Sequence, residues 1–233
     1  MATTTFLAMT AAEIENCSGL PPAIAWMACH FSPYGTGLSN LPKTLPAGSL
    51  LILNDRTPIH MHDPKRIGDQ LADCMERFQC AGLLLDFQNP GCEQTAKLTK
   101  YLVETLPCPV AVSTHYAHQL TCPVFLPPLP HHIPLEEYVL PWENREIWLE
   151  LAMDSEVITL TESGAEVAAL PPGEGKENGH MENDLHCHYR IETADDNAVF
   201  TLWRTKEDLV DLLTKAESLG ISTTIGLYQE LSG

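Results

Sequence analysis

The chain has 233 residues, of which 44% are hydrophobic, so it is long and apolar enough to build one sizeable core. We therefore expect a single domain over residues 1–233. The formal charge of −18, and the lack of any apolar run of about 20 residues, argue against nucleic acid and membranes as partners.

Strand and helix patterns alternate through the first two thirds of the chain. Asp63 can cap a helix that starts at Pro64, and apolar side chains at spacings of three and four continue to Phe78. A loop rich in Gly and Pro, His30–Gly48, separates the first two strands. In chain order we expect strands at Ala23–Cys29, Ser49–Asn54, Gly82–Phe87, Pro109–Ser113, Pro123–Leu126, Ile147–Met153 and Thr223–Tyr228, and further helices at Glu93–Leu106 and Lys206–Leu219.

The last third of the chain carries a pattern typical of antiparallel strands. Two pairs of short apolar runs are each joined by a turn, which predicts two hairpins within an antiparallel elaboration at residues 155–204. The polar, Gly-rich stretch 171–184 predicts a flexible loop. Whether Val199–Arg204 is a barrel strand or the return arm of a hairpin stays open. The runs are Val157–Leu160 with Val167–Leu170, and His186–Glu192 with Val199–Arg204.

Strands separated by helices predict a parallel sheet and the α/β class. The spacing of the early strands suits a (β/α) barrel of the TIM type, for which about 250 residues is typical. Since the chain is slightly short and some helices are missing, we predict an irregular or degenerate TIM-type barrel with an antiparallel β insertion in its last third. Such barrels carry their chemistry at the carboxyl ends of the strands.

The segment Ala81–Gln88, AGLLLDFQ, brings Asp86 and Gln88 to the carboxyl end of a buried strand. It resembles the signature Asp-Gly-x-Asp-x-Asp-x-Glu of family 18 glycoside hydrolases, the chitinase-like barrels. Gly82 and Asp86 match the signature. Ala81, Leu84 and Gln88 stand where the family has its first two acids and its catalytic Glu.

The resemblance implies a barrel that binds a carbohydrate or a related small polar ligand. In that family the Glu protonates the glycosidic oxygen and the neighbouring Asp orients the N-acetyl group of the substrate. An amide cannot act as a general acid, so Gln88 removes this step, although it can still form hydrogen bonds to a ligand. A simpler alternative is that Asp86 and Gln88 only cap the strand or pair with Arg56.

Polar and aromatic side chains also follow the other strands, where they would meet at one mouth. Glu230 is a candidate for a displaced general acid or base, with Asp86 or Asp55 as its partner; the alternative is a Glu at a frayed end. The predicted catalytic residues are Asp86 and Glu230, and the predicted ligand-binding residues are Gln88, Asp55, Arg56, His30, Tyr34, His115, Tyr116 and Tyr228.

Three other readings of the sequence stay open. A metal-dependent hydrolase could use the pairs His60-Met61-His62 and His186-Cys187-His188, which alternation along a strand would point the same way. Without a zinc spacing or a dinucleotide or phosphate-binding motif, we predict no metal and no cofactor. A cysteine nucleophile, such as Cys29 or Cys187, has little support. A non-catalytic interaction module would have its strand ends plugged by Tyr34, Tyr116 and the Pro-rich loop.

The eight cysteines are scattered, without any CxxC, which is typical of reduced thiols. The first residues lack the basic region and long apolar core of a signal peptide. We therefore expect a cytoplasmic protein of a bacterium, and the sequence does not predict its oligomeric state.

Overall fold

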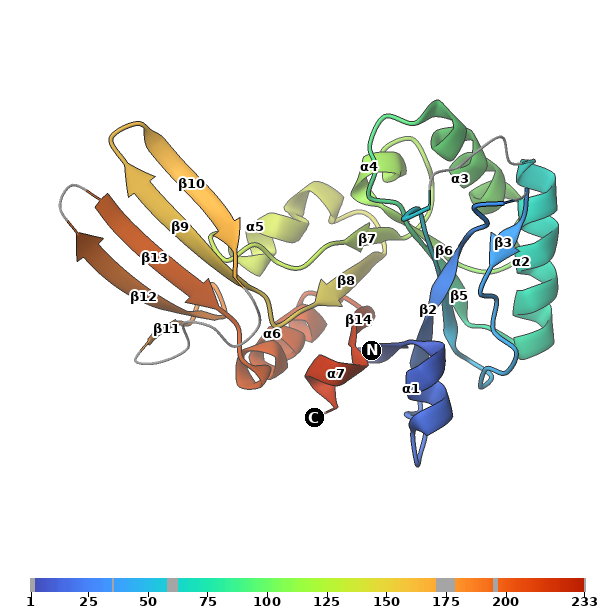
Figure 1. Ribbon diagram of the computed structural model, residues 1–233, viewed down its shortest axis with the longest axis horizontal. Helices are drawn as coiled ribbons and strands as arrows, with labels where there is room; N and C mark the ends of the chain where they lie inside the picture. Colours follow the sequence, from blue (N-terminus) through green and yellow to red (C-terminus); the bar gives the residue numbers. More distant parts are fainter. Residues whose placement is uncertain (1–2, 35, 58–62, 171–178, 195–196, 233) are drawn as a thin grey trace.

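Eight parallel strands close into a barrel in the computed structural model, which describes residues 3–34, 36–57, 63–170, 179–194 and 197–232 (Figure 1). The predicted TIM-type barrel is confirmed. Around the ring the strands are β1 (Thr4–Met9), β2 (Ile24–Phe31), β4 (Leu50–Asn54), β5 (Gly82–Asp86), β6 (Val110–Ser113), β7 (Val124–Leu126), β8 (Ile147–Leu151) and β14 (Thr223–Leu227).

The strand that closes the ring, β1, is absent from the sequence prediction. It pairs in parallel with β14, through Thr4 and Thr223, and with β2, through Leu7 and Ile24. The run Ala23–Cys29, predicted as the first strand, is therefore part of the second, and Gly82–Asp86 forms the fourth barrel strand. Without β1, β14 would be an edge strand, and β2 would keep only the two-residue β3 on that side.

The helices on the outside of the barrel differ in length, which agrees with the predicted irregular barrel. The three long ones are α2 (Pro64–Phe78), α3 (Glu93–Thr105) and α6 (Lys206–Ser218), all predicted. Asp63 caps α2 by accepting from the backbone N–H of Lys65. The short ones are α1 (Ala11–Asn16), α4 (Thr114–Ala117), α5 (Leu135–Val139), the 3₁₀ turn η1 (Leu140–Trp142) and α7 (Tyr228–Leu231).

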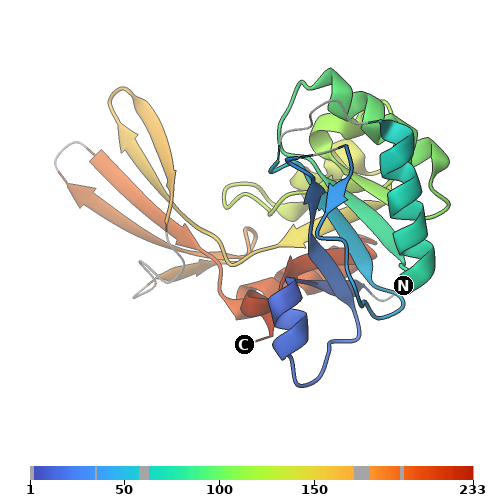
Figure 2. The ribbon, with the colours of Figure 1, turned by 45° about the vertical axis from the view of Figure 1, so that its right-hand side comes forward.

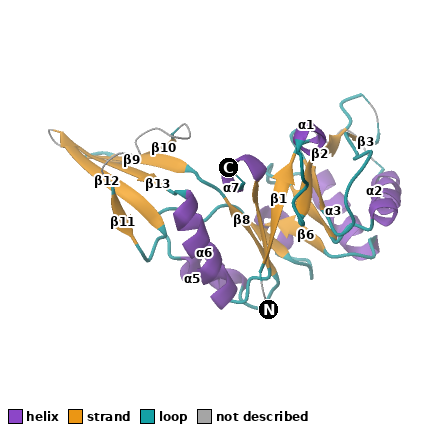
Figure 3. Cartoon of the chain, turned by 90° about the horizontal axis from the view of Figure 1, so that it is seen from below, coloured by secondary structure: helices purple, strands orange, loops and turns teal. Residues whose placement is uncertain are grey.

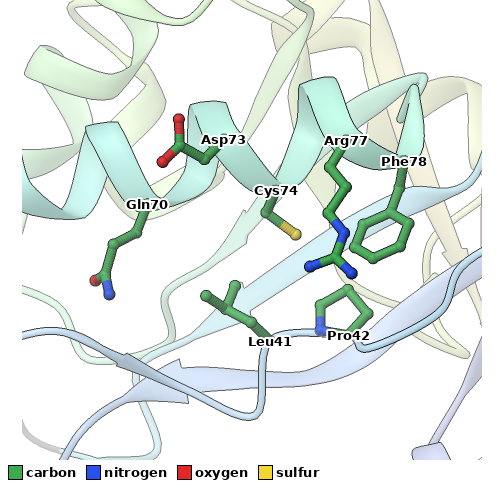
Figure 4. A pocket seen from close by; sticks show the side chains of 7 residues that line it. All are labelled: Leu41, Pro42, Gln70, Asp73, Cys74, Arg77 and Phe78. Atoms are coloured by element: carbon green, nitrogen blue, oxygen red, sulfur yellow. The ribbon is translucent and has the colours of Figure 1, made fainter.

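The connection from β2 to β4 carries a short strand, β3 (Leu38–Ser39), where His30–Gly48 was predicted as a loop. The side chain of Gln70 on α2 accepts from the backbone N–H of Leu38 at 3.0 Å. Figure 4 shows the shallow groove beside this contact, of about 230 Å³, where Cys74 and Arg77 face Leu41 and Pro42. It lies between α2 and the loop that follows β3.

A second, antiparallel sheet is inserted between β8 and α6 and confirms the predicted insertion. Its order is β10-β9-β13-β12-β11, so Val199–Arg204 contributes to a hairpin strand and not to the barrel. Figures 2 and 3 show it extending away from the barrel, with α6 near its base. The strands are β9 (Ser155–Thr161), β10 (Gly164–Ala169), β11 (His180–Glu182), β12 (Cys187–Ala194) and β13 (Asn197–Trp203).

Part of the predicted flexible loop 171–184 thus forms β11, and residues 171–178 lie outside the described residues. The inserted sheet is held to the barrel by Arg204, which is 1% exposed. Its guanidinium donates to the carbonyl of Leu129 at 2.5 Å, to that of His186 at 3.1 Å and to the Asp154 carboxylate at 3.3 Å. These partners compensate for burying the charge.

The barrel interior is filled by one compact apolar cluster, which includes Leu84 from β5 and Trp148 from β8. Gly82 lies two residues before Leu84, so it faces the same interior. A Cβ at Gly82 would lie 2.9 Å from the Trp148 ring and 3.1 Å from the carbonyl oxygen of Pro109. The glycine of the family-like segment is thus required for packing Trp148 inside the barrel.

We predict that Gly82→Ala lowers the free energy of unfolding by about 1–3 kcal/mol, because a methyl group there overpacks the interior. Urea unfolding monitored by far-UV circular dichroism measures this change. Gly19→Ala is the matched control, since a Cβ at Gly19 meets no atom within 4 Å. Equal stability of the two variants would contradict the packing role of Gly82.

Candidate functional site

The carboxyl ends of the barrel strands carry a polar layer above the apolar interior. Because side chains alternate along a strand, a residue two positions after an interior one also points inward. Asp86 follows Leu84 in this way on β5, and Glu150 follows Trp148 on β8. Both carboxyl groups are half-buried, so they face the mouth of the barrel and remain accessible to solvent.

Asp86 and Gln88 lie side by side, as predicted. The exposed amide of Gln88 donates a hydrogen bond to the Asp86 carboxylate. Burial raises the pKa of Asp86, the Gln88 hydrogen bond opposes the rise, and the charges of Asp55 and Arg56 act in opposite directions. In the described part of the chain Arg56 forms no ion pair with Asp86 and no hydrogen bond with Gln88; the backbone N–H of Arg56 instead donates to the side chain of Asn54.

Asp55 organises the loop after β5. Its buried carboxylate accepts from the backbone N–H of Gln88 at 3.1 Å and of Asn89 at 3.0 Å, and from the Asn89 amide at 2.9 Å. These bonds fix the position of Gln88 at the mouth. The Asp55 carboxylate thus accepts its hydrogen bonds from within the protein, and its predicted contact with a ligand stays a prediction.

Glu150 was missed in the sequence analysis and has the most perturbed carboxyl group of the mouth. Burial, followed by the negative charges of Asp86, Glu230 and Asp154, raises the pKa of Glu150 to about 7. No hydrogen bond to its carboxyl group comes from the described residues. A single Glu in the strand IWLEL gives little signal by itself. Its position two residues after an interior Trp is the pattern that could have revealed it.

The tyrosine beside Glu150 belongs to α5. The hydroxyl of Tyr138 donates to the carbonyl of Pro127 at 3.0 Å. Burial and the charge of Glu150 raise the pKa of Tyr138 to about 12. Tyr138 therefore stays protonated and neutral at pH 7, so it adds no charge beside Glu150.

Glu230 lies on α7, where its carboxylate accepts from the backbone N–H of Met153 at 2.8 Å. It is close enough to raise the pKa of Glu150 by its charge. The hydrogen bond ties α7 to the end of β8. The predicted catalytic role of Glu230 stays a prediction.

The two residues predicted to follow the strand Ala23–Cys29 differ in their surroundings, and His30 lies within β2 itself. The His30 ring is held within the protein: Nδ1 lies 2.8 Å from the carbonyl oxygen of Phe31, and Nε2 lies 3.1 Å from the Asn40 amide nitrogen. Tyr34 is 98% exposed, so it does not plug the strand ends.

The residues predicted after β6 and β14 lie around the rim. The hydroxyl of Tyr116 donates to the carbonyl of Asn89, which joins α4 to the Asp55-bound loop. His115 is exposed and lines a groove of about 900 Å³ between α3 and α4. The Tyr228 hydroxyl lies 3.5 Å from the Cys17 sulfur, on the side of α1. Of these three residues, Tyr116 alone forms a hydrogen bond with the loop after β5 within the described part of the chain.

The histidine pairs do not form a metal site in the part of the chain that is described. His186 precedes β12 and has a left-handed backbone with φ of 48°, so strand alternation does not apply to it. His188 is engaged elsewhere, with Nδ1 2.8 Å from an Asp208 oxygen. No three His, Cys, Asp or Glu residues among those described could hold an ion together. His60 and His62 lie outside the described residues.

All eight cysteines are free thiols. Burial raises the pKa of Cys29 to about 12 and that of Cys187 to about 11. Both are therefore protonated at neutral pH and are poor nucleophiles. No helix of the described residues is long and apolar enough to cross a membrane.

No model of a known protein family matches the chain, and no curated protein matches it in sequence. Solved structures do match. An N-acetylglucosaminidase of glycoside hydrolase family 18 from Paenibacillus barengoltzii superposes with a TM-score of 0.65 and 9% identity, over 98% of this chain and 97% of that one.

Two other solved structures also match the chain in fold at low sequence identity. The spore cortex-lytic enzyme SleL of Bacillus cereus has a TM-score of 0.62 and 8% identity, over 97% of this chain and 70% of that one. A family 18 chitinase from Cycas revoluta, in complex with (GlcNAc)3, has a TM-score of 0.55 and 11% identity, over 95% and 94%. The resemblance to family 18 is confirmed at the level of the fold.

We predict that Glu150→Gln stabilises the protein at pH 8 by about 1–3 kcal/mol and has little effect near pH 4. The folded pKa of about 7 lies above the ordinary value of 4.5, so the folded state holds a proton that the unfolded chain releases. The contribution of this proton to the free energy of unfolding is therefore complete below about pH 4.5 and is lost as the pH rises to about 7. The thermal midpoint measured from pH 4 to 8 tests this, with the exposed Glu143→Gln as control. A parallel pH dependence in both variants would contradict it.

Asp55→Ala should lower the free energy of unfolding by about 2–4 kcal/mol, because it removes the buried carboxylate that accepts the backbone N–H groups of Gln88 and Asn89 and the Asn89 amide. Asp73→Ala, at an exposed position of α2, is the control. Chemical denaturation at pH 7 gives both values, and a loss no larger than that of the control would show that the loop does not depend on Asp55.

Proposed function

We propose that the protein is a glycosidase-like barrel that binds an N-acetylated carbohydrate at the carboxyl ends of its strands. The observation that carries this proposal is the Asp86–Gln88 pair, in the strand whose sequence resembles family 18. Asp86 is half-buried and inward, and the exposed Gln88 amide offers both a donor and an acceptor beside it. Structures of the same fold include a chitinase bound to (GlcNAc)3.

The position of Gln88 supports binding without hydrolysis by the family route. Its amide cannot give a proton to a glycosidic oxygen, and its hydrogen bond to Asp86 occupies the neighbouring carboxylate. An acetamido group could exchange hydrogen bonds with the same pair. The free thiols support a cytoplasmic location as part of this proposal.

Thermal unfolding with N-acetylglucosamine tetramer tests the proposal. At 100 times its dissociation constant a ligand adds about 2.7 kcal/mol, or about 5–10 °C for a chain of this size. We expect this rise for the wild type and a much smaller one for Asp86→Ala. Asp73→Ala serves as the matched control and should keep the full rise.

Cellotetraose, which lacks the acetamido group, should raise the midpoint less than the acetylated tetramer. If neither sugar changes the midpoint of the folded wild type, the carbohydrate proposal is wrong. A rise that is the same in Asp86→Ala would place the ligand away from the strand ends.

A further inference from the structure

One carboxyl group at the mouth differs from the others in its hydrogen bonding within the described part of the chain. Asp55 holds the loop after β5, Glu230 holds the end of β8, and Asp86 accepts from Gln88. Glu150 accepts no hydrogen bond from the described residues, although it is half-buried and points into the barrel. Burying a carboxyl group without a partner costs stability, so a position of this kind is a candidate for function.

We propose that Glu150 is the catalytic proton donor of a glycoside hydrolysis in which Asp86 is the general base. The inference rests on the proposed function, since it uses the same mouth and the same class of ligand. It deepens that function by assigning the general acid to the seventh barrel strand, β8. The family-like position, Gln88, follows the fourth barrel strand, β5.

The arrangement around the ring supports these roles. β5 and β8 are separated by β6 and β7, so Asp86 and Glu150 approach the mouth from different sides. A sugar lying across the mouth would have one carboxyl group on each side of its glycosidic bond. Inverting glycosidases use such a pair, with space for a water molecule between the base and the sugar.

Hydrogen bonding and charge distinguish the two carboxyl groups. The Gln88 amide donates to Asp86 and favours its ionised form. Among the described residues none donates a hydrogen bond to Glu150, and the charged groups that act on it are Asp86, Glu230 and Asp154, all acidic. The neutral Tyr138 lies beside it. These neighbours favour the protonated form of Glu150, which is the form that a general acid needs.

The proposed reaction is a single displacement. Glu150 gives its proton to the glycosidic oxygen as the bond between that oxygen and C1 breaks. A water oxygen forms the new bond to C1 from the opposite face, and Asp86 takes the proton that this water loses. The products are the shortened sugar and a new reducing end of inverted configuration, and the two carboxyl groups exchange protons with solvent to restore the site.

Two substrates separate a proton donor from a residue that only shapes the site. Cleavage of the N-acetylglucosamine tetramer needs a protonated leaving group, whereas p-nitrophenyl N-acetylchitobioside releases a phenolate that needs little help. We expect Glu150→Gln to lower kcat/KM for the tetramer by about 10²–10⁴-fold and for the aryl glycoside by less than about 10-fold. Glu143→Gln, an exposed change of the same type, should leave both values unchanged.

The pH profile and the product configuration complete the test. Wild-type kcat/KM for the tetramer should fall above about pH 7, and this fall should be absent for the aryl glycoside in Glu150→Gln. Proton NMR of the first product should show the inverted anomer; a retained anomer would overturn the role of Asp86 as base. Equal losses on both substrates, or none on either, would overturn the role of Glu150 as acid.

Calorimetry with the tetramer separates this inference from the proposed function. If the folded wild type binds the tetramer but cleaves neither substrate over pH 4–8, the catalytic inference is wrong and the binding function stands. If it neither binds nor cleaves, both are wrong. The thermal midpoint of Glu150→Gln, recorded in the same buffers, shows that any loss of activity comes from a folded protein.

Discussion

The closure of the barrel by β1 is the constraint on which the rest of the structure depends. β1 pairs with the last strand and with the second, so all eight strands share one interior. Once the ring is closed, alternation decides which side chains point inward. Leu84 and Trp148 fill the apolar interior, and the residues two positions further along, Asp86 and Glu150, must then meet at the mouth. Like charges are brought together there by the geometry of the ring.

The acidic side chains at the mouth differ in their hydrogen-bond partners. Asp55 is satisfied by two backbone N–H groups and an amide, and Glu230 by a backbone N–H. Asp86 receives the Gln88 amide. Glu150 receives no hydrogen bond from the described residues, and its pKa rises to about 7. An acid at position 88 would have added a further negative charge beside Asp86, whereas the amide adds a donor.

Local patterns in the sequence predicted most of the fold, and the failures have physical causes. Helix caps such as Asp63 and buried runs such as Gly82–Phe87 carry their signal within a few residues. β1 was missed because a short, threonine-rich run becomes a strand only through its pairing with β14, over 200 residues away. His186 was misjudged because its left-handed backbone interrupts the alternation assumed for the pair with His188. Glu150 was missed because its role depends on Asp86, which comes from a strand three positions away around the ring.

The same geometry explains why a motif on one strand is an incomplete guide to a barrel of this kind. The carboxyl ends of all eight strands open to one mouth, so an inward side chain from any of them can reach a ligand there. Whether a residue can act on a ligand depends on whether its side chain points into the barrel and on its hydrogen-bond partners. It does not depend on which strand supplies the residue. Position 88, after the fourth strand, holds an amide and not an acid, while Glu150 on the seventh strand places an acid at the mouth. A carboxyl group at the mouth therefore has to be sought by register around the whole ring.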